Sequence, residues 1–256
     1  MIDIHCHVIP LVDDGAKSFE ESLNMGRKAQ EIGITAMIAT PHYIEGSTTI
    51  SSEAIRESVK ILNEEFKKHQ IDVTIYPGNE IFFSNDMFEI LENKKAFSLN
   101  QTKYVLFEFP MYHEEIPRNA FHEIENLQIS GYYPILAHPE RYLFTKKHMN
   151  ILEEMIHNGV LMQLDLGSVL GIYGKMAKRN AKKLLKKNMI HLIATDSHNA
   201  SRLYPQYALA YQKLQRMISK EKLDEILEKN SKKILKGKKL QPYIIKKDIF
   251  DKLKIK

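Results

Sequence analysis

Short apolar segments rich in β-branched residues alternate with longer segments of helical periodicity, and this alternation restricts the possible folds of the chain more than any other feature. Seven of the short segments have the length and composition of strands. They cover residues 1–5, 36–40, 73–77, 104–109, 133–137, 160–164 and 189–195. Because strands that alternate with helices pair in parallel, the sequence predicts a parallel α/β sheet, either open or closed into a barrel.

The first predicted helix has clear signals at both ends. Ser18, with Glu21 three residues later, forms a capping box, and Gly33 follows the apolar positions as a stop. The next helix carries an apolar stripe typical of core packing, at Ile55, Val59, Leu62 and Phe66. Later helices are expected at residues 115–130, 147–158, 175–187, 205–219 and 222–236.

Length and composition indicate a soluble globular protein. The 256 residues suffice for one large core, and we expect a single domain over residues 1–256. The hydrophobic content is 43% and the charged content 27%. No apolar run approaches the ~18 residues of a membrane span, and no basic segment followed by an apolar stretch begins the chain. We therefore expect a cytoplasmic protein without membrane insertion.

The formal net charge of +5 originates at the C-terminus. Residues 229–256 contain eleven Lys and two Asp, a net charge of +9, so residues 1–228 sum to −4. Tails of this kind attract phosphorylated, acidic or membrane-surface partners in some proteins, but we interpret this one as a solvated helical face with a frayed end. We expect no nucleic-acid binding, and the sequence does not indicate an oligomeric state.

The chain has one cysteine, Cys6. This count excludes an internal disulfide and any cysteine-rich zinc or iron–sulfur site. It also excludes the Cys-x5-Arg nucleophile of cysteine-based tyrosine phosphatases, because Val12 stands six residues after Cys6. Any metal must therefore be held by histidines and carboxylates.

Residues of metal-ligand type stand at or just after the ends of the predicted strands. They are His5, His7, His42, Glu80, Glu108, His138, Asp196 and His198. In a parallel α/β barrel the C-terminal ends of all strands lie on one face, so these scattered residues can converge. Asp13 and Asp14, in the first loop, can bring another carboxylate over the mouth. Each residue alone is more often a capping or hydrogen-bonding group, but the joint pattern favours ligation.

The strand period of two refines this prediction. His5 and His7 point to the same side of their strand and Cys6 to the opposite one, so the barrel lumen is the natural place for both imidazoles. Asp196 and His198 repeat the same spacing on the last strand.

Imidazole and carboxylate ligands without thiolate suit Mn, Fe or Zn. Five histidines and several carboxylates exceed what one ion can use, so we expect two or three ions. Clustered ions ~3.5–4 Å apart activate water and clamp the oxygens of a transferring phosphoryl group. The ligand series therefore favours phosphoester hydrolysis.

Two arginines follow candidate ligands by a few positions. Arg141 follows His138, and Arg202 follows His198. A guanidinium group binds phosphate through two parallel hydrogen bonds, so both arginines are candidate catalytic residues. The alternative for each is a salt bridge within its loop.

Six ordered motifs carry a family resemblance: MIDIHCHVIPLVDDGAKS, GITAMIATPHY, YPGNEI, LFEFP, LAHPERY and ATDSHN. Together they resemble the PHP (polymerase and histidinol phosphatase) superfamily. The chain is most similar to the manganese-dependent protein-tyrosine phosphatases of Gram-positive capsule and exopolysaccharide operons, over almost its full length. The resemblance implies a distorted (β/α)7 TIM-like barrel, the PHP fold, with a trinuclear metal site, expected to hold Mn²⁺, on the C-terminal face of the strands.

The resemblance also implies a role for each candidate residue. One ion would be held by His5, His7, Glu80 and Asp196, a second by Glu80, Glu108 and His138, and a third by Asp14, His42 and His198. Arg141 and Arg202 would bind the phosphate, while a metal-bridging hydroxide would attack phosphorus in line and expel the tyrosine phenolate. The implied substrate is phosphotyrosine on a bacterial tyrosine kinase that controls polysaccharide synthesis.

A few positions depart from the family pattern. Leu11 stands where the family often has Gly, and Tyr43 where a second His is common, so the first loops can differ in shape. Residues 163–168, QLDLGS, match only loosely: Asp165 can face the site but is not predicted as a ligand. His113 is a weak candidate for the site because it follows a ligand-bearing strand closely.

Two other functions stay open. The first is another phosphoesterase of the same superfamily, such as histidinol-phosphate phosphatase or the exonuclease module of a polymerase, although the lack of a polymerase domain argues against the exonuclease. The second is a catalytically silent barrel that binds the kinase or assembles the polysaccharide machinery. Nine candidate ligands disfavour it, because binding alone does not require them.

Overall fold

Nine strands, all paired in parallel, form the centre of the structure, a computed structural model that describes residues 1–242. They are β1 (Ile2–Cys6), β2 (Ala36–Ala39), β3 (His42–Tyr43), β4 (Thr74–Pro77), β5 (Glu80–Phe82), β6 (Tyr104–Glu108), β7 (Tyr133–Ala137), β8 (Leu161–Asp165) and β9 (Leu192–Ala194). The prediction for the basic tail falls partly on residues 243–256, which lie outside the described residues.

The nine strands occupy seven positions around a barrel. β2 pairs with β4, and their continuations β3 and β5 pair with each other. Each of these two positions is therefore one interrupted strand, broken at residues 40–41 and 78–79. β5 then pairs with β6, and the order continues through β7 and β8 to β9.

The first and last strands close the ring. The His7 backbone N–H donates to the Ser197 carbonyl at 2.9 Å, and the Asp196 N–H donates to the His5 carbonyl at 2.9 Å. A parallel bridge pairs Cys6 with Ser197. The predicted distorted (β/α)7 barrel is confirmed, with its distortion concentrated at the two interrupted strands.

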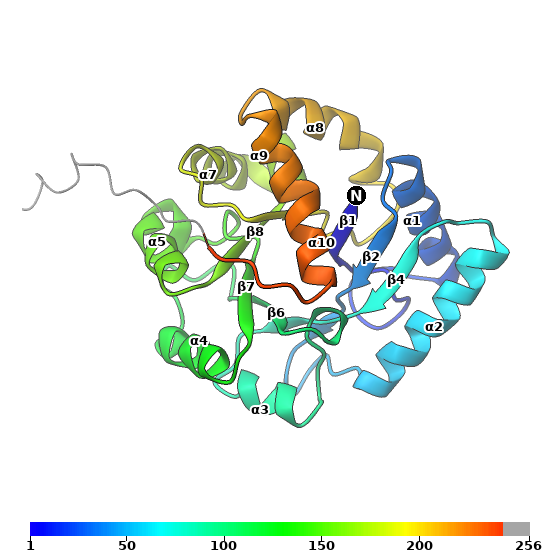
Figure 1. Cartoon of the computed structure of the whole chain (residues 1–256), viewed down its shortest axis with the longest axis horizontal. Coiled ribbons are helices and arrows are strands. Elements are labelled where there is room, and N and C mark those ends of the chain that lie inside the picture. Colours follow the sequence, from blue (N-terminus) through cyan, green and yellow to red (C-terminus); the bar gives the residue numbers. More distant parts are fainter. Residues whose placement is uncertain (243–256) are drawn as a thin grey trace, which may run out of the picture.

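Helices surround the strands, as Figure 1 shows. They are α1 (Phe19–Glu31), α2 (Ser52–Lys68), α3 (Met87–Glu92), α4 (Ala120–Ile129), α5 (Met149–His157), α6 (Leu166–Leu170), α7 (Gly174–Lys186) and α8 (Tyr207–Gln215). The predicted start of α1 is confirmed, because the Ser18 hydroxyl accepts a hydrogen bond from the Glu21 N–H at 3.1 Å. The predicted stripe of α2 is buried.

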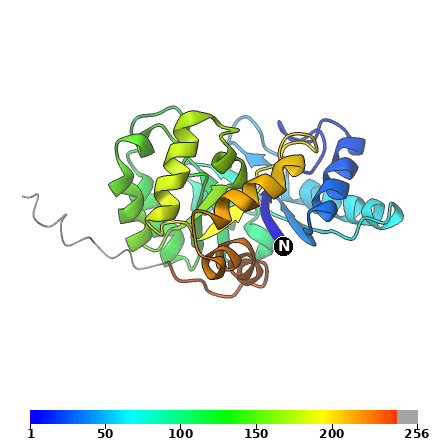
Figure 2. The same cartoon turned by 90° about the horizontal axis from the view of Figure 1, so that it is seen from above.

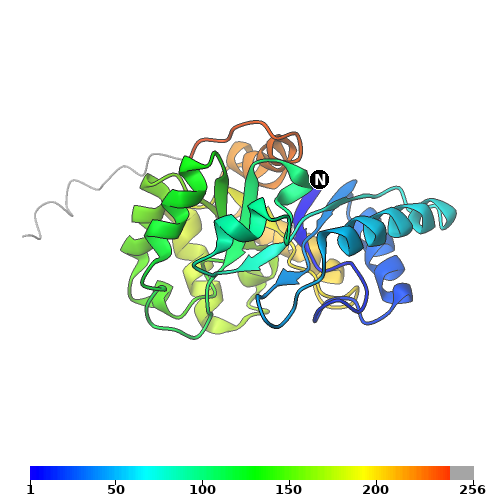
Figure 3. The same ribbon diagram turned by 90° about the horizontal axis from the view of Figure 1, so that it is seen from below.

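One end of the barrel is covered by the last helical segment. α9 (Lys220–Asp224), a π-helical turn at Glu225–Lys229 and α10 (Asn230–Leu235) lie on the same side as the N-terminus of the chain (Figures 2 and 3). Ile234 and Leu240 are buried there with the interior residues Ile2 and Ile4. Since this segment covers the N-terminal ends of the strands, the opposite, C-terminal end is the one available for a site.

The interior of the barrel is apolar near the covered end. One core cluster takes residues from β1, β2, β6, β7, β8 and β9, so it fills the lumen. Polar residues of the same strands occupy the other end of the lumen. Among the described residues, none of the helices combines the length and apolar character needed to cross a membrane.

Several element boundaries differ from the predictions. β3, β5, α3 and α6 were not predicted, because segments of two to six residues give no readable periodicity. α4 begins at Ala120 instead of residue 115, since residues 110–119 form an irregular loop that contains Pro117. β9 begins at Leu192 instead of residue 189, because Met189 and Ile190 are buried in the connection from α7. The remaining strand ends coincide with the predictions or differ by one residue, as is usual.

Candidate metal centre

The nine residues predicted as ligands lie together at the C-terminal end of the barrel. Donor atoms of eight of them form three groups, within each of which the atoms lie within 4.8 Å of one another, and the ninth, His138, adjoins these groups through Glu80. The groups are His5, His7, Glu80 and Asp196; His7, Asp14, His42 and His198; and His42, Glu80 and Glu108. Each pair of groups shares one residue, so the three form one continuous cluster.

A β-bulge in β1 turns the two histidines of the first strand into the lumen. Ile2 pairs with Ala36, but the register to β2 shifts between Asp3 and Cys6. Without this shift, the alternation that directs Ile2 and Ile4 inward would direct His5 outward. The extra residue re-aims the strand, as bulges do beside active sites. His5 and His7 consequently face the lumen and Cys6 faces away, as predicted.

The first group is compact and fully buried. Nε2 of His5 lies 3.2 Å from Oε2 of Glu80 and 3.3 Å from Oδ1 of Asp196. Nε2 of His7 lies 3.3 Å from the same Asp196 oxygen. Glu80 Oε2 and Asp196 Oδ1 accept no hydrogen bond from any of residues 1–242. Buried oxygens aimed at imidazole nitrogens without hydrogen bonds fit a bound cation better than a hydrogen-bonded core.

Glu80, Glu108 and His138 lie on the adjoining side of the cluster. Nε2 of His138 lies 2.8 Å from Oε1 of Glu80 and 3.7 Å from Oε2 of Glu108. Nδ1 of His42 lies 3.3 Å from Oε1 of Glu108. The two oxygens of Glu80 therefore point to different groups, which is the arrangement expected of a bridging carboxylate.

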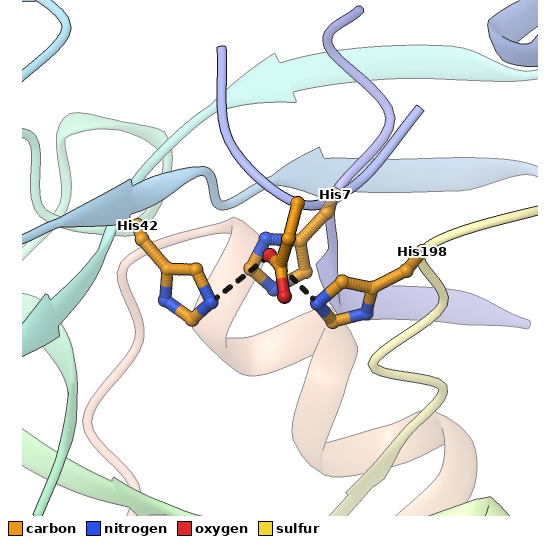
Figure 4. Close-up of side chains that lie close together, drawn as sticks. His7, His42 and His198 are labelled. Atoms are coloured by element: carbon orange, nitrogen blue, oxygen red, sulfur yellow. Dashed lines mark ion pairs between the residues drawn. The ribbon is translucent and has the colours of Figure 1, made fainter. Parts of the chain in front are cut away.

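The remaining group is partly open to solvent. Figure 4 shows the imidazoles of His7, His42 and His198 around one carboxylate. This carboxylate belongs to Asp14, whose Oδ1 lies 3.4 Å from Nε2 of His42 and 3.3 Å from Nε2 of His198. Because Asp14 comes from the first loop and the histidines from three different strand ends, only the folded barrel brings this group together.

Two further residues orient the buried imidazoles. Oδ2 of Asp13 lies 2.8 Å from Nδ1 of His7, and Oε1 of Gln163 lies 2.8 Å from Nδ1 of His5. Each contact leaves Nε2 facing the cluster, as outer partners of metal-bound histidines do. The sequence offered a signal for Gln163, because it precedes Asp165 by two residues on one strand, but its role was not predicted.

The backbone at two ligands adopts an unusual conformation. His138, directly after β7, has φ 34°, and Asp196, two residues after the end of β9, has φ 48°. Non-glycine residues in this region are strained, and such strain is concentrated at functional sites. Leu11, in the first loop, has φ 63° and a side chain that is 76% exposed, which explains why glycine would suit this position.

The cluster carries opposing charges in a buried environment. Burial alone would lower the pKa of His5, but the carboxylates of Glu80 and Asp196 raise it to about 9. Burial alone would raise the pKa of Glu80, but His5 and His42 bring it well below its usual range. The buried carboxylates are therefore stable as anions only with positive charge beside them. Either protons on the imidazoles or bound cations can supply this charge.

Arg141 lies at the edge of this cluster, in a cavity of about 310 Å³ that Asp14, Asp196 and His198 also line. Its Nη1 donates to Asp165 Oδ2 at 2.9 Å and to Asp196 Oδ2 at 2.6 Å. Both partners lie at the ends of other strands, so these ion pairs differ from the predicted alternative of a salt bridge within the loop. Among the described residues, the hydrogen bonds of Arg141 use Nη1 alone. The N–H groups of Nη2 and Nε therefore remain available to bind an anion.

Tyr173 links the two predicted arginines. Its ring centroid lies 4.2 Å from Cζ of Arg141 and 5.3 Å from Cζ of Arg202. Nη2 of Arg202 donates to the Ile172 carbonyl at 3.2 Å, and no ion pair within residues 1–242 involves Arg202. Both guanidinium groups line the same cavity as Asp14. Tyr173 was not identified from the sequence, since nothing local marks a ring that contacts residues about 30 positions away on either side.

Of the two remaining candidates, Asp165 lies at the site and His113 does not. Asp165 is buried, binds Arg141 and accepts a hydrogen bond from Gln163 Nε2 at 3.0 Å, so it faces the site but belongs to none of the three groups. His113 is exposed in the loop before α4 and joins none of these groups. Tyr43, at the position where a second histidine is common, is buried in the core outside the barrel.

The sequence matches a family model described as capsular polysaccharide synthesis, CpsB/CapC, over residues 1–236. Tyrosine-protein phosphatase YwqE of Bacillus subtilis is 39% identical over 199 residues, which cover 78% of each chain. Tyrosine-protein phosphatase CpsB of Streptococcus agalactiae is 30% identical over 242 residues, which cover 93% of this chain and 99% of the relative.

Solved structures agree with this similarity. One solved structure comes from a study of YwqE of Bacillus subtilis and CpsB of Streptococcus pneumoniae, which are described as metal-dependent tyrosine phosphatases. It superposes on this chain with a TM-score of 0.90 at 33% identity, and the match covers 97% of this chain and 99% of the other. Histidinol phosphate phosphatase of Lactococcus lactis superposes with a TM-score of 0.56 at 15% identity, covering 84% and 93%. The second likeness concerns the fold alone.

Proposed function

The chain belongs to the CpsB/CapC family of capsular polysaccharide synthesis proteins, and we propose on this basis that it is a metal-dependent protein-tyrosine phosphatase, a phosphoric monoester hydrolase. Its relatives YwqE and CpsB carry the name tyrosine-protein phosphatase and cover most of its length. The observation that carries the proposal is the continuous cluster of imidazoles and carboxylates beside Arg141.

The donor set fits divalent ions. It contains imidazole and carboxylate groups without thiolate, which suits Mn²⁺, with Fe or Zn as alternatives. We assign one ion to His5, His7, Glu80 and Asp196, a second to Glu80, Glu108 and His138, and a third to Asp14, His42 and His198. His7 uses Nδ1 for Asp13, so its Nε2 serves one ion only. We assign this nitrogen to the first ion because it lies 3.3 Å from Oδ1 of Asp196 and 3.5 Å from Oε2 of Glu80.

Bound ions at this cluster would lower the pKa of water to supply the nucleophile and would neutralise charge on the phosphoryl group. Arg141 would bind a phosphate oxygen through Nη2 and Nε, and Arg202, which lines the same cavity and also lies over the Tyr173 ring, would approach the same anion. The hydrogen bonds of Nη1 to Asp196 and Asp165 hold the Arg141 side chain in place before substrate binds.

The protein has no alternative nucleophile of the cysteine type. The Cys6 thiol is buried outside the lumen and lies 3.4 Å from the Ile38 carbonyl, to which it donates. Burial raises its pKa well above the usual value, which keeps it protonated. The phosphoryl group would therefore pass directly to water.

The physiological substrate that we propose is a phosphotyrosine-bearing bacterial tyrosine kinase that regulates capsular or exopolysaccharide synthesis in the cytoplasm. The family description and the relatives' names support a phosphoprotein substrate in that context. The flexible phosphorylated tail of such a kinase could reach the open group of Asp14 and His198 without unfolding.

A substrate panel tests the proposal. The Mn²⁺-loaded protein is assayed with a phosphotyrosine peptide, the same peptide carrying phosphoserine, and histidinol phosphate. We expect the highest kcat/KM for phosphotyrosine. A preference for histidinol phosphate would identify the other phosphoesterase activity, and no turnover of any ester, with the protein folded and metal-loaded, would identify a silent barrel.

A further inference from the structure

A second cavity opens at the C-terminal face of the barrel, on the other side of the metal centre from Tyr173. Its volume is about 680 Å³. Three segments line it, namely residues 44–45 after β3, residues 82–85 at the end of β5 and residues 117–119 in the loop before α4. None of the nine candidate ligands lines it, and neither do Arg141 and Arg202. The proposed hydrolysis of the phosphate ester therefore does not require this cavity.

The strand register relates the cavity to two ligands. His42 pairs with Glu80, and Tyr43 pairs with Ile81. Tyr43 and Ile81 are buried in the core cluster outside the barrel. Because side chains alternate along a strand, His42 and Glu80 face the lumen, as the metal cluster also requires.

The next lumen-facing residues on both strands belong to the cavity. Ile44 and Phe82 stand two positions after the paired ligands, one step closer to the mouth of the barrel. Phe83 extends the apolar surface, and its ring packs against Phe109 with centroids 5.3 Å apart. The cavity therefore adjoins the metal centre through an apolar and aromatic floor.

The charged residues of the cavity are Glu45 and Arg118. Glu45 is paired, because Nζ of Lys95 lies 3.6 Å from its Oε1. Arg118 is exposed, and no ion pair or hydrogen bond with another of residues 1–242 involves its side chain. The cavity thus offers one unneutralised positive charge beside its aromatic floor.

We propose that this cavity, lined by Ile44, Phe82, Phe83 and Arg118, binds the polypeptide next to the phosphotyrosine, with an apolar side chain on the phenylalanines and an acidic side chain at Arg118. The inference rests on the proposed function and adds a substrate preference to it. A small phosphate monoester occupies only the metal centre and the Arg141 cavity, whereas a phosphopeptide has flanking chain to place beside them. Charge complementarity selects an acidic flank.

The test compares three phosphotyrosine peptides of equal length whose flanking residues are Asp, Asn or Lys, together with p-nitrophenyl phosphate. Each is assayed with the Mn²⁺-loaded wild type and with Arg118→Gln and Arg118→Glu. Arg216→Gln is the matched control, since Arg216 is also exposed but ends α8 and lines neither this cavity nor that of Arg141.

We expect the wild type to prefer the Asp peptide over the Asn peptide by about five-fold in kcat/KM, the size of one exposed ion pair. Arg118→Gln removes this preference, and Arg118→Glu shifts it to the Lys peptide. Turnover of p-nitrophenyl phosphate stays unchanged in all variants, and raising the salt concentration weakens the wild-type preference.

Equal kcat/KM for the three peptides in the wild type would overturn the inference, as would an equal loss for Arg216→Gln. In either case undiminished turnover of p-nitrophenyl phosphate and phosphotyrosine leaves the proposed function standing. A metal-loaded wild type that hydrolyses none of these esters would overturn the proposed function, and the inference with it.

Discussion

Arg141 and Asp196 form a hydrogen bond of 2.6 Å between Nη1 and Oδ2. The other oxygen of Asp196 lies 3.3 Å from Nε2 of His5 and 3.3 Å from Nε2 of His7. One carboxylate therefore joins the arginine expected to hold phosphate to the residues expected to hold an ion. Phosphate binding and metal binding should consequently respond together to changes at Asp196.

Asp196→Asn keeps the shape of this carboxylate and removes its charge. We expect at least a ~100-fold loss of kcat/KM on a phosphotyrosine peptide and a lower metal content, because a ligand and the anchor of Arg141 weaken together. Elemental analysis and steady-state kinetics measure the two effects.

Asp165→Asn is the matched control for this variant. Asp165 contacts Arg141 at 2.9 Å but belongs to none of the three ligand groups, so its variant should weaken phosphate binding while it retains the metal content. Loss of metal from Asp165→Asn, or full retention of metal by Asp196→Asn, would contradict the assignment of their roles.

Tyr173 positions both arginines through its ring. Tyr173→Leu should weaken competitive inhibition by inorganic phosphate about three- to five-fold, because each ring contact with a guanidinium group is worth about 0.5–1 kcal/mol at a partly exposed site. Tyr173→Phe retains the ring and should keep nearly the wild-type inhibition constant. A wild-type inhibition constant for Tyr173→Leu would contradict a role of the ring, and an equal weakening in both variants would assign the effect to the hydroxyl group.

Asp13 orients His7 from outside the cluster. Asp13→Asn should reduce metal affinity roughly 10- to 100-fold, the usual effect of removing an outer partner of a metal-bound histidine. Gln163→Leu should act in the same direction through His5. Metal titration of the apo protein measures both, with Asp72→Asn as the control because Asp72 is exposed and outside the three groups. Unchanged affinity in Asp13→Asn would show that His7 needs no partner.

His191 makes stability sensitive to acid. Burial, with a smaller contribution from the charge of Lys222, lowers the pKa of His191 from 6.5 to about 3. Between these pH values the unfolded chain binds a proton that the folded chain does not, so the free energy of unfolding falls as pH falls, by at most ~1.4 kcal/mol per pH unit. Above pH ~6.5 this histidine contributes no pH dependence.

His191→Asn removes the titration while it keeps an acceptor for the Met162 N–H, which Nδ1 of His191 accepts at 3.0 Å. In denaturant titrations we expect the variant to lose less stability than the wild type between pH 6.5 and pH 4. Parallel pH profiles for the two proteins would exclude His191 as the source of acid sensitivity.

Local signals in the sequence were sufficient for the framework of the barrel. The cap at Ser18 and the stripe of α2 are encoded within one helix each, so they could be read directly. Candidate ligands could be selected because parallel strands end on one face, which converts positions far apart in sequence into neighbours. The ion assigned to each residue stays a prediction.

Other features depend on contacts between distant segments and could not be read. The bulge in β1 appears only in its register with β2, and the positive φ of His138 follows from the turn after β7. Tyr173 and Arg141 lie in different loops that meet only in the folded barrel. Arg118 becomes part of a cavity only because the loop before α4 lies beside the end of β5. These features all lie at the site, where function takes precedence over local propensity.

The central claim is that hydrolysis depends on ions held by this cluster of histidines and carboxylates. The most direct measurement is the turnover of one phosphotyrosine peptide by a single preparation before chelation, after metal removal verified by elemental analysis, and after Mn²⁺ is restored. We predict that turnover falls below about 1% without metal and recovers with Mn²⁺, because the ions supply both the nucleophile and the charge stabilisation. Full turnover by the verified metal-free protein would contradict the account.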